Sequence, residues 1–201
     1  LRGRVDPNTH DRGAAEEEQI PLVRAAAQRA GLSEDVRVSL HNDFPTGAGL
    51  GGSSAAATAV LGALDLWSGI PVDRVSIAER GRQIEVEDLG VAGGRQDHYC
   101  AAHGGLLGLT FGDAVTVERI SLSATLRESL QQRCALVYTG ESRISGETIA
   151  GVIEAYRHGE KQVIFALARL RDLARQMIAA LTLADLDGLA TLVDEHWAHQ
   201  R

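Results

Sequence analysis

The spacing of apolar residues changes along the chain, and each change predicts a different element. Residues 21–30 begin with a proline, are rich in alanine and stop before Gly31, which predicts a helix. In residues 36–40, two valines and a leucine alternate with polar residues, which predicts a half-buried strand. The polar residues 1–20 show no such pattern, and we interpret them as irregular.

Two further helices are predicted in the middle of the chain. The first is apolar and runs from Ser53 to about Trp67. The second is capped by Asp73 and reaches about Asp88, with Gly90 just past its end.

The rest of the chain changes from strand patterns to helical ones. Two apolar runs, residues 106–111 and 114–120, flank Gly112-Asp113, which predicts a hairpin with a two-residue turn. Residues 135–138 predict one more strand, and residues from about 145 to 201 are almost wholly helical. A stripe at helical spacing is expected to be core: Leu167, Leu170, Leu173, Met177 and Leu181.

Composition narrows the class of protein. A chain of 201 residues with 44% hydrophobic and 23% charged residues is an ordinary globular chain of one domain, or one domain plus part of another. The net charge of −7 and 4% aromatics disfavour nucleic-acid binding, so a phosphate ligand should be held by backbone amides and a metal. No apolar run is long enough for a membrane span. Cys100 and Cys134 are expected to be reduced thiols in a cytoplasmic protein.

The most informative segment is the glycine loop, residues 43–52, which lies between the predicted strand and the predicted helix. Its four glycines allow a close approach of the backbone, and the helix that follows offers unpaired N–H groups to an anion. The alternative is a tight turn with a serine N-cap. A P-loop is excluded because the segment has no lysine, and a dinucleotide fingerprint is disfavoured because Asp73 begins a helix instead of ending a strand.

Two carboxylates are candidates for chemistry. Glu85 shares a helix face with Ala78 and Gly81 and is expected to point inward, whereas Glu87 shares its face with Arg80 and Gln83 and looks solvated. An amphipathic helix with solvated acids is the alternative for Glu85. Asp97 follows the turn Gly93-Gly94, where it could act on a ligand or merely cap the next helix.

The segment Pro45-Thr-Gly-Ala-Gly-Leu-Gly-Gly-Ser-Ser-Ala-Ala resembles the phosphate loop of the GHMP small-molecule kinases. The spacing from Glu85 to Asp97 is similar to that of the galactokinase branch. The residues Arg95-Gln-Asp-His-Tyr99 resemble the Lys-Gln-Asp-Gln-Tyr of the heptose-phosphate and fucose kinase branch. Arg95 stands where lysine is common, and His98 stands where glutamine is common.

The resemblance implies a role for each of these residues. Ser53 and Glu85 would ligate Mg2+, Asp97 would deprotonate or orient the sugar hydroxyl, and Arg95 would stabilise the transferred phosphoryl group. Arg143, in a Thr-Gly-x-x-Arg segment similar to one in the heptose-phosphate branch, would meet a sugar phosphate. The contacts to ATP would come from Pro45, Gly47, Ala48, Gly49, Leu50, Gly51, Gly52, Ser53 and Ser54. A zinc site at His98, Cys100 and His103 is a weaker alternative, because no second cluster supplies further ligands.

The resemblance also implies an α+β fold of two lobes, with residues 1–132 in the N-terminal lobe and residues 133–201 opening a ferredoxin-like C-terminal lobe. The chain has no initial methionine and stops within a helical pattern, so we expect it to be part of a longer protein. The implied activity is ATP- and Mg2+-dependent phosphorylation of a sugar, with the anomeric hydroxyl of a heptose 7-phosphate favoured. A fucokinase or galactokinase relative and a catalytically silent sugar or nucleotide sensor are the alternatives. The partner is a small molecule, not a nucleic acid or a membrane, and the sequence leaves a monomer and a homodimer open.

Overall fold

The computed structural model describes residues 13–32, 38–41, 47–137 and 145–200. It divides into two compact units, one made of Leu1–Gly104 with Tyr138–Glu147 and the other of Gly105–Val137 with Thr148–Arg201. In the part of the chain that the structure describes, helices and one antiparallel hairpin give an α+β fold, as the resemblance implies. These units divide the chain at other positions than the predicted lobes, whose boundary near residue 133 stays a prediction. No described helix combines the length and the apolar character that a membrane span requires.

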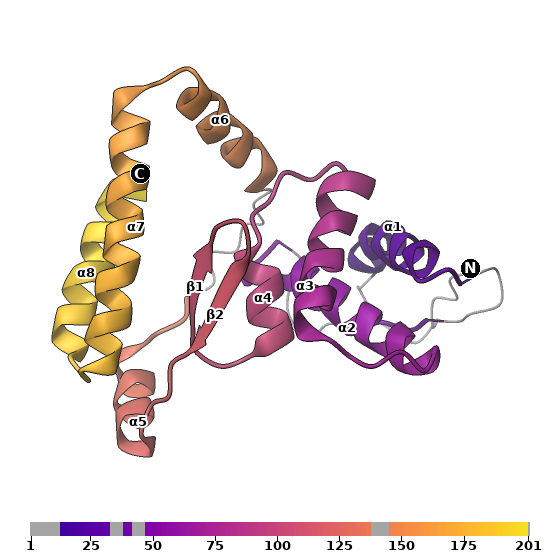
Figure 1. The fold of residues 1–201 in the computed structure, drawn as a ribbon, viewed down its shortest axis with the longest axis horizontal. Coiled ribbons are helices and arrows are strands. Elements are labelled where there is room, and N and C mark those ends of the chain that lie inside the picture. Colours follow the sequence, from indigo (N-terminus) through magenta and orange to yellow (C-terminus); the bar gives the residue numbers. More distant parts are fainter. Residues whose placement is uncertain (1–12, 33–37, 42–46, 138–144, 201) are drawn as a thin grey trace. The chain divides into compact units, whose positions relative to one another are not determined.

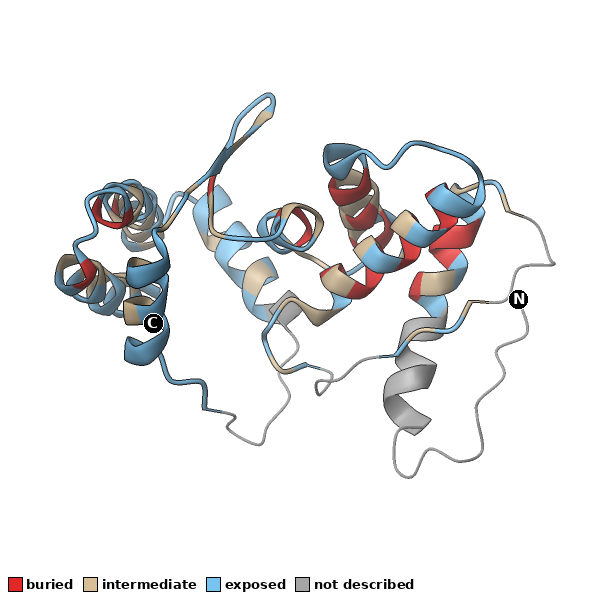
Figure 2. Ribbon diagram, turned by 90° about the horizontal axis from the view of Figure 1, so that it is seen from below, coloured by how far each residue is buried: buried red, intermediate tan, exposed pale blue. Residues whose placement is uncertain are grey.

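The first unit is helical among its described residues (Figure 1), with elements α1 (Gly13–Arg29), α2 (Gly52–Trp67), α3 (Arg74–Gln83), η1 (Ile84–Asp88) and α4 (Gln96–His103). Its core comes from α1, α2 and the α3–η1 segment, and Figure 2 shows buried residues on these helices. Leu61 and Ile84 are fully buried there, and the alanines of α1 and α2 allow the helices to pack closely.

Helix α1 is longer than predicted. It starts at Gly13 and contains Pro21, so the expectation that residues 1–20 are irregular is wrong for residues 13–20. A proline removes only one helical hydrogen bond, and the glutamates before it and alanines after it favour helix. The predicted end is confirmed: Gly31 has φ +68° and the Leu32 N–H donates to the Ala27 carbonyl at 3.0 Å.

The predicted helix over residues 73–88 forms, and it changes from an α-helix to a π-helix after Gln83. Asp73 caps it by accepting a hydrogen bond from the Ser76 N–H at 2.7 Å. The last turn, η1, is a π-helix. Arg80 contradicts the expected solvated face, because it is partly buried and its Nη1 donates to Oδ1 of buried Asp65 on α2 at 2.9 Å.

The strand predicted over residues 36–40 is not found where the structure describes it. Residues 38–40 are irregular, although Val38 and Leu40 pack against the core and Ser39 is exposed, so the expected alternation of burial is kept. Val36 lies outside the described residues. A half-buried pattern therefore forms here without strand pairing among the described residues.

The second unit contains the hairpin β1 (Leu107–Phe111) and β2 (Val115–Arg119), followed by α5 (Ala124–Arg133), α6 (Ser145–Arg157), α7 (Lys161–Thr182) and α8 (Leu186–Gln200). Helix α6 begins in the first unit and continues into this one. The strands pair antiparallel with Phe111 opposite Val115, so the connection has three residues instead of the predicted two. Residues 135–137 are irregular and their large apolar side chains are exposed, so the predicted strand is wrong there; Tyr138 lies outside the described residues.

Helices α7 and α8 lie side by side (Figure 1), and the helical prediction after residue 145 is confirmed for the described residues. In the predicted core stripe, Leu173 and Leu181 are buried, Leu170 and Met177 are half-buried, and Leu167 is exposed. Because Leu167 is exposed whereas Leu173 and Leu181 are buried, the stripe forms core only toward the C-terminal end of α7.

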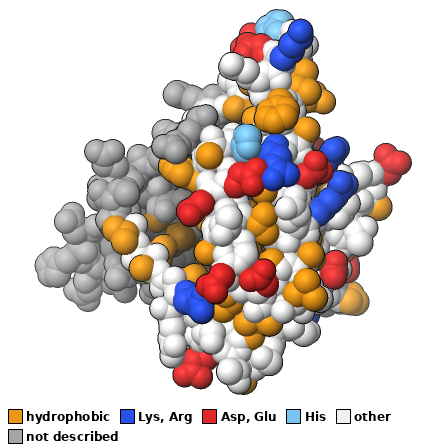
Figure 3. Space-filling model, turned by 90° about the vertical axis from the view of Figure 1, so that its left-hand side faces the viewer, with side chains coloured by type: hydrophobic (Ala, Val, Ile, Leu, Met, Phe, Trp, Pro, Cys, Tyr) orange, Lys and Arg blue, Asp and Glu red, His pale blue; other side chains and the backbone are white. Residues whose placement is uncertain are grey.

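Figure 3 shows the face on the left-hand side of Figure 1, where hydrophobic side chains are interspersed with acidic and basic ones.

Candidate functional site

The described part of the glycine loop ends in an open helix terminus. Gly47, Gly49 and Gly51 have φ between +68° and +73°, a region that other residues rarely adopt. Gly51 is the N-cap of α2 and offers no side chain to its first N–H groups, and the first turn contains no acidic residue. The alternative of a serine N-cap is therefore wrong, and a helix start without a side-chain cap is of the kind that can bind an anion. Pro45 lies outside the described residues.

Asp97 lies against this loop. A Cβ atom built at Gly51 would be 3.4 Å from Asp97 Cβ and 3.5 Å from its carboxyl carbon. Asp97 sits in the first turn of α4, whose N-cap is Arg95, so the alternative that Asp97 caps this helix is wrong. Its side chain is exposed, which leaves the carboxylate accessible to a ligand at the loop.

Glu85 points inward, as its helix face predicts. It is 8% exposed, and its Oε2 lies 3.1 Å from Nε2 of His98. Burial raises the pKa of Glu85, but its contacts with the His98 and Ser53 side chains outweigh that effect and hold the pKa below its ordinary value. The carboxylate is therefore ionised at neutral pH.

The oxygens of Glu85 and Ser53 suit a Mg2+ ion. Oε1 of Glu85 is buried and has no hydrogen-bond partner, and the Ser53 hydroxyl lies close enough to the carboxylate to lower its pKa. A buried, charged oxygen without a donor is costly unless a cation or water meets it. Mg2+ prefers hard oxygen ligands and takes few from the protein, so one carboxylate and one hydroxyl fit it.

The zinc alternative has no support among the described residues. No three side chains of His, Cys, Asp or Glu lie together there as a metal cluster. His98 instead faces Glu85, Cys100 is exposed, and His103 stacks on Tyr99 with ring centroids 5.9 Å apart.

Arg95 has a partner that the sequence did not reveal. Its Nε lies 3.5 Å from Oε2 of Glu79 on α3, and the Tyr99 hydroxyl donates to Oε1 of the same glutamate at 2.7 Å. Burial and the bond to Glu79 raise the pKa of Tyr99 to about 12, so this hydroxyl keeps its proton. Glu79 therefore pairs with the guanidinium of Arg95. No local spacing in the sequence indicates this contact, because it joins two helices.

His98 is the second residue whose place sequence reasoning missed. It is 1% exposed, and its Nδ1 lies 3.5 Å from the hydroxyl of buried Ser54. The sequence signal for it was Gly81 within a helical pattern, because a Cβ there would lie 2.9 Å from His98 Cδ2. Of the other predicted site residues, Gly52 begins α2, Ala48 is half-buried and Leu50 is exposed. Arg143 lies outside the described residues.

Comparison with known proteins places this loop and these carboxylates in a family. Residues 20–105 match the family model described as GHMP kinases N terminal domain. A D-glycero-alpha-D-manno-heptose 7-phosphate kinase of Campylobacter jejuni is 31% identical over 170 residues, covering 81% of this chain and 49% of that protein. A mevalonate kinase of Thermococcus sibiricus is 28% identical over 166 residues, covering 81% of this chain and 46% of that protein.

A solved structure shows the same fold. The crystal structure of a D-glycero-D-manno-heptose 1-phosphate kinase from Bacteroides thetaiotaomicron has a TM-score of 0.69 at 22% identity, covering 90% of this chain and 55% of that one. The chain thus spans about half the length of the relatives it matches. Residues 20–105, which contain the glycine loop, Glu85 and Asp97, belong to the family of GHMP kinase N-terminal domains.

Proposed function

We propose that the full-length protein is an ATP- and Mg2+-dependent sugar kinase whose acceptor is the anomeric hydroxyl of D-glycero-D-manno-heptose 7-phosphate. The observation that supports it best is the closeness of Asp97 to Gly51, where an added Cβ would lie 3.4 Å from Asp97 Cβ. It brings an exposed carboxylate to the loop before an open helix N-terminus, as transfer from a bound nucleotide to a hydroxyl requires.

Each residue then has one task. The backbone of residues 47–54 holds the nucleotide phosphates at the start of α2. Asp97 accepts the proton of the acceptor hydroxyl, whose oxygen bonds to the γ-phosphorus while the bond from that phosphorus to the β–γ bridging oxygen breaks. Arg95, oriented by Glu79, neutralises charge on the transferred group.

Ser53 and Glu85 would hold Mg2+, which when bound offsets the charge of the nucleotide phosphates. The buried Oε1 of Glu85 supports this assignment. The low pKa of Glu85 supports it too, because a protonated carboxyl group would bind the cation poorly.

The acceptor is proposed from the similarity to the heptose 7-phosphate kinase of Campylobacter jejuni. The test is a kinase assay of the full-length protein with heptose 7-phosphate, the free heptose, fucose, galactose and mevalonate. The highest kcat/KM is expected for heptose 7-phosphate. A preference for another acceptor would overturn the substrate while keeping the kinase, and nucleotide binding without turnover on any acceptor would favour the silent sensor.

Arg143 provides a second test of the acceptor. A chain of net charge −7 repels a dianionic sugar phosphate, and this repulsion is screened beyond about 8 Å at physiological salt, so a local cation must compensate it. Arg143→Ala should lower kcat/KM for heptose 7-phosphate at least about tenfold more than for the free heptose, and Arg143→Lys should restore only part, because the bidentate geometry is lost. Equal losses on both acceptors would remove Arg143 from the phosphate site.

A further inference from the structure

His98 occupies a buried position between the elements that carry the candidate metal ligands. It belongs to α4, next to Asp97, and it faces η1 through Glu85 and α2 through Ser54. Ser54 directly follows Ser53, the other candidate ligand. One imidazole on the helix of the candidate base therefore contacts the candidate ligand Glu85 and the residue next to the candidate ligand Ser53.

The two ring nitrogens have different tasks. The carboxylate of Glu85 only accepts hydrogen bonds, so Nε2, which lies 3.1 Å from Oε2, is the nitrogen that carries hydrogen in the neutral ring. Nδ1 then accepts from the Ser54 hydroxyl, at the long distance of 3.5 Å. The contact to Oε2 is not fully aligned as a hydrogen bond, and Oε1 of Glu85 stays without a partner.

The surrounding residues are matched to this ring. Gly81 has no side chain, and a Cβ there would lie 2.9 Å from His98 Cδ2, closer than real contacts allow. The glycine in the middle of α3 therefore leaves the space that the imidazole fills. This close packing restricts the orientation of the imidazole ring, and the ring in turn restricts the orientation of the Glu85 carboxylate that it contacts.

We propose that His98 is a positioning residue that holds the Glu85 carboxylate relative to α2 and leaves Oε1, which has no hydrogen-bond partner, available to a cation. This inference rests on the proposed role of Glu85 as a magnesium ligand. Residues that hydrogen-bond to a metal-ligating side chain orient that side chain, and losing such a residue typically costs about 10–100-fold in metal affinity.

The test measures binding of ADP to the full-length protein by calorimetry, with and without Mg2+. The quantity compared is the factor by which Mg2+ increases the affinity for ADP. His98→Leu keeps most of the volume and removes both nitrogens, and it should reduce this factor about tenfold or more. His98→Gln, which can still donate to Glu85, should keep the factor within about threefold of wild type. His103→Leu makes the same exchange elsewhere on α4 and should leave it unchanged.

A double variant separates this inference from the function on which it rests. If His98 acts through Glu85, His98→Leu has no further effect on the factor in a Glu85→Gln background. A wild-type factor in Glu85→Gln alone would remove the metal role of Glu85 and the inference with it. A reduced factor in Glu85→Gln with a wild-type factor in His98→Leu would overturn the inference about His98 and leave the metal role standing. Should His98→Leu not fold, His98→Asn, which is too short to reach Glu85, gives the same comparison.

Discussion

At the residue scale, the exposed carboxylate of Asp97 contrasts with the buried carboxylate of Glu85. Asp97 lies open against the glycine loop, whereas Glu85 is enclosed by Ser53 and His98. The two acids of the site therefore suit different tasks, since an open carboxylate can meet an acceptor hydroxyl and an enclosed one can hold a cation.

The first prediction concerns Asp97. Asp97→Asn keeps the size of the side chain and removes its charge, so kcat of the full-length enzyme should fall by about 10²–10⁴-fold. The affinity for ADP with Mg2+ should stay near that of wild type, because no proton is transferred in that complex. Steady-state kinetics and calorimetry measure the two quantities. A variant with near wild-type kcat would contradict the assignment.

At the element scale, α3 packs against α4 at Gly81, where a residue with a side chain would not leave room for the His98 ring. Gly81→Ala would place a Cβ 2.9 Å from His98 Cδ2, and we expect it to lower the free energy of unfolding by about 1–3 kcal/mol. The matched control is Gly62→Ala in α2, where the new Cβ would be 3.8 Å from Ile77 Cδ1. That exchange should be neutral or should stabilise by up to about 1 kcal/mol through helix propensity. Urea unfolding of both variants makes the comparison, and equal stability of the two would contradict the close packing of His98.

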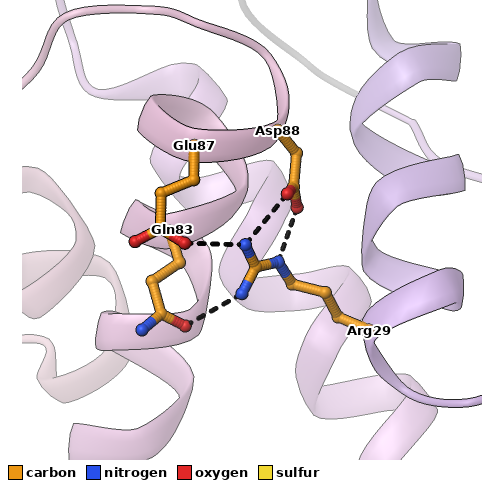
Figure 4. Close-up of polar contacts among 4 residues, drawn as sticks. All are labelled: Arg29, Gln83, Glu87 and Asp88. Carbon is orange, nitrogen blue, oxygen red and sulfur yellow. Dashed lines mark hydrogen bonds and ion pairs between the residues drawn. The ribbon is translucent and has the colours of Figure 1, made fainter.

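A second element-scale prediction concerns Arg29, which joins α1 to the end of the α3–η1 segment (Figure 4). Its Nη2 lies 2.9 Å from Oδ1 of Asp88 and 3.0 Å from Oε2 of Glu87, and Nη1 donates to Gln83 at 3.1 Å. The hydrogen bonds from Arg29 hold the pKa of Asp88 below its ordinary value of 3.8, although burial opposes them. Because the groups are partly exposed, we expect Arg29→Met to cost only about 1 kcal/mol at pH 7.

The sign of the pH dependence follows from that lowered pKa. The contribution of Asp88 is fully present above the pKa of the unfolded chain and is lost as the pH falls through the lower pKa of the folded chain. The difference in unfolding free energy between wild type and Arg29→Met should therefore stay constant from pH 7 to about pH 5 and shrink as the pH falls toward and below 3.8, while that for the exposed Arg24→Met stays flat. Denaturant titrations at several pH values measure it, and a difference that grows on acidification would contradict the contact.

Sequence predicted the elements whose signals are local. Helix α2 and the capped start of α3 depend on residues within a few positions, and both form where expected. The strands expected at residues 36–40 and 135–138 failed in their described parts, because a strand depends on a partner that no local pattern names. The π-turn at Glu85 was also not predicted, since its hydrogen bonds span five residues instead of the four of an α-helix, and no residue pattern marks that change.

The candidate site shows the same difference between features with a local signal and features that depend on a distant partner. The inward direction of Glu85 followed from its helix face, whereas the contacts of His98 with Glu85 and of Arg95 with Glu79 join residues from different helices. Arg80 was assigned to solvent for the same reason, because its partner Asp65 lies one helix away. The positions of Arg80, Arg95 and His98 therefore depend on tertiary pairing that helix periodicity does not describe.

At the scale of the whole molecule, the described candidate residues lie in one compact unit. The glycine loop, Glu85, Arg95 and Asp97 all belong to the unit made of Leu1–Gly104 and Tyr138–Glu147. The other unit has a core of its own around α7 and α8, where Leu173 is fully buried. Stability and ligand binding should therefore respond to different substitutions.

Leu173→Ala tests this division. Removing a fully buried leucine side chain leaves a cavity and should lower the free energy of unfolding of the second unit by about 2–5 kcal/mol. No described candidate for nucleotide contact lies in that unit, so the affinity for ADP with Mg2+ should remain that of wild type at a temperature where the variant is folded. Calorimetric unfolding and ADP titration of the full-length protein measure both quantities, with the half-buried Met177→Leu as a control that keeps the volume of the same helix. A loss of ADP affinity in Leu173→Ala that Met177→Leu does not share would contradict this division. It would mean that the core of α7 and α8 supports the nucleotide site, because the effect of the cavity would then reach residues 47–97 of the other unit.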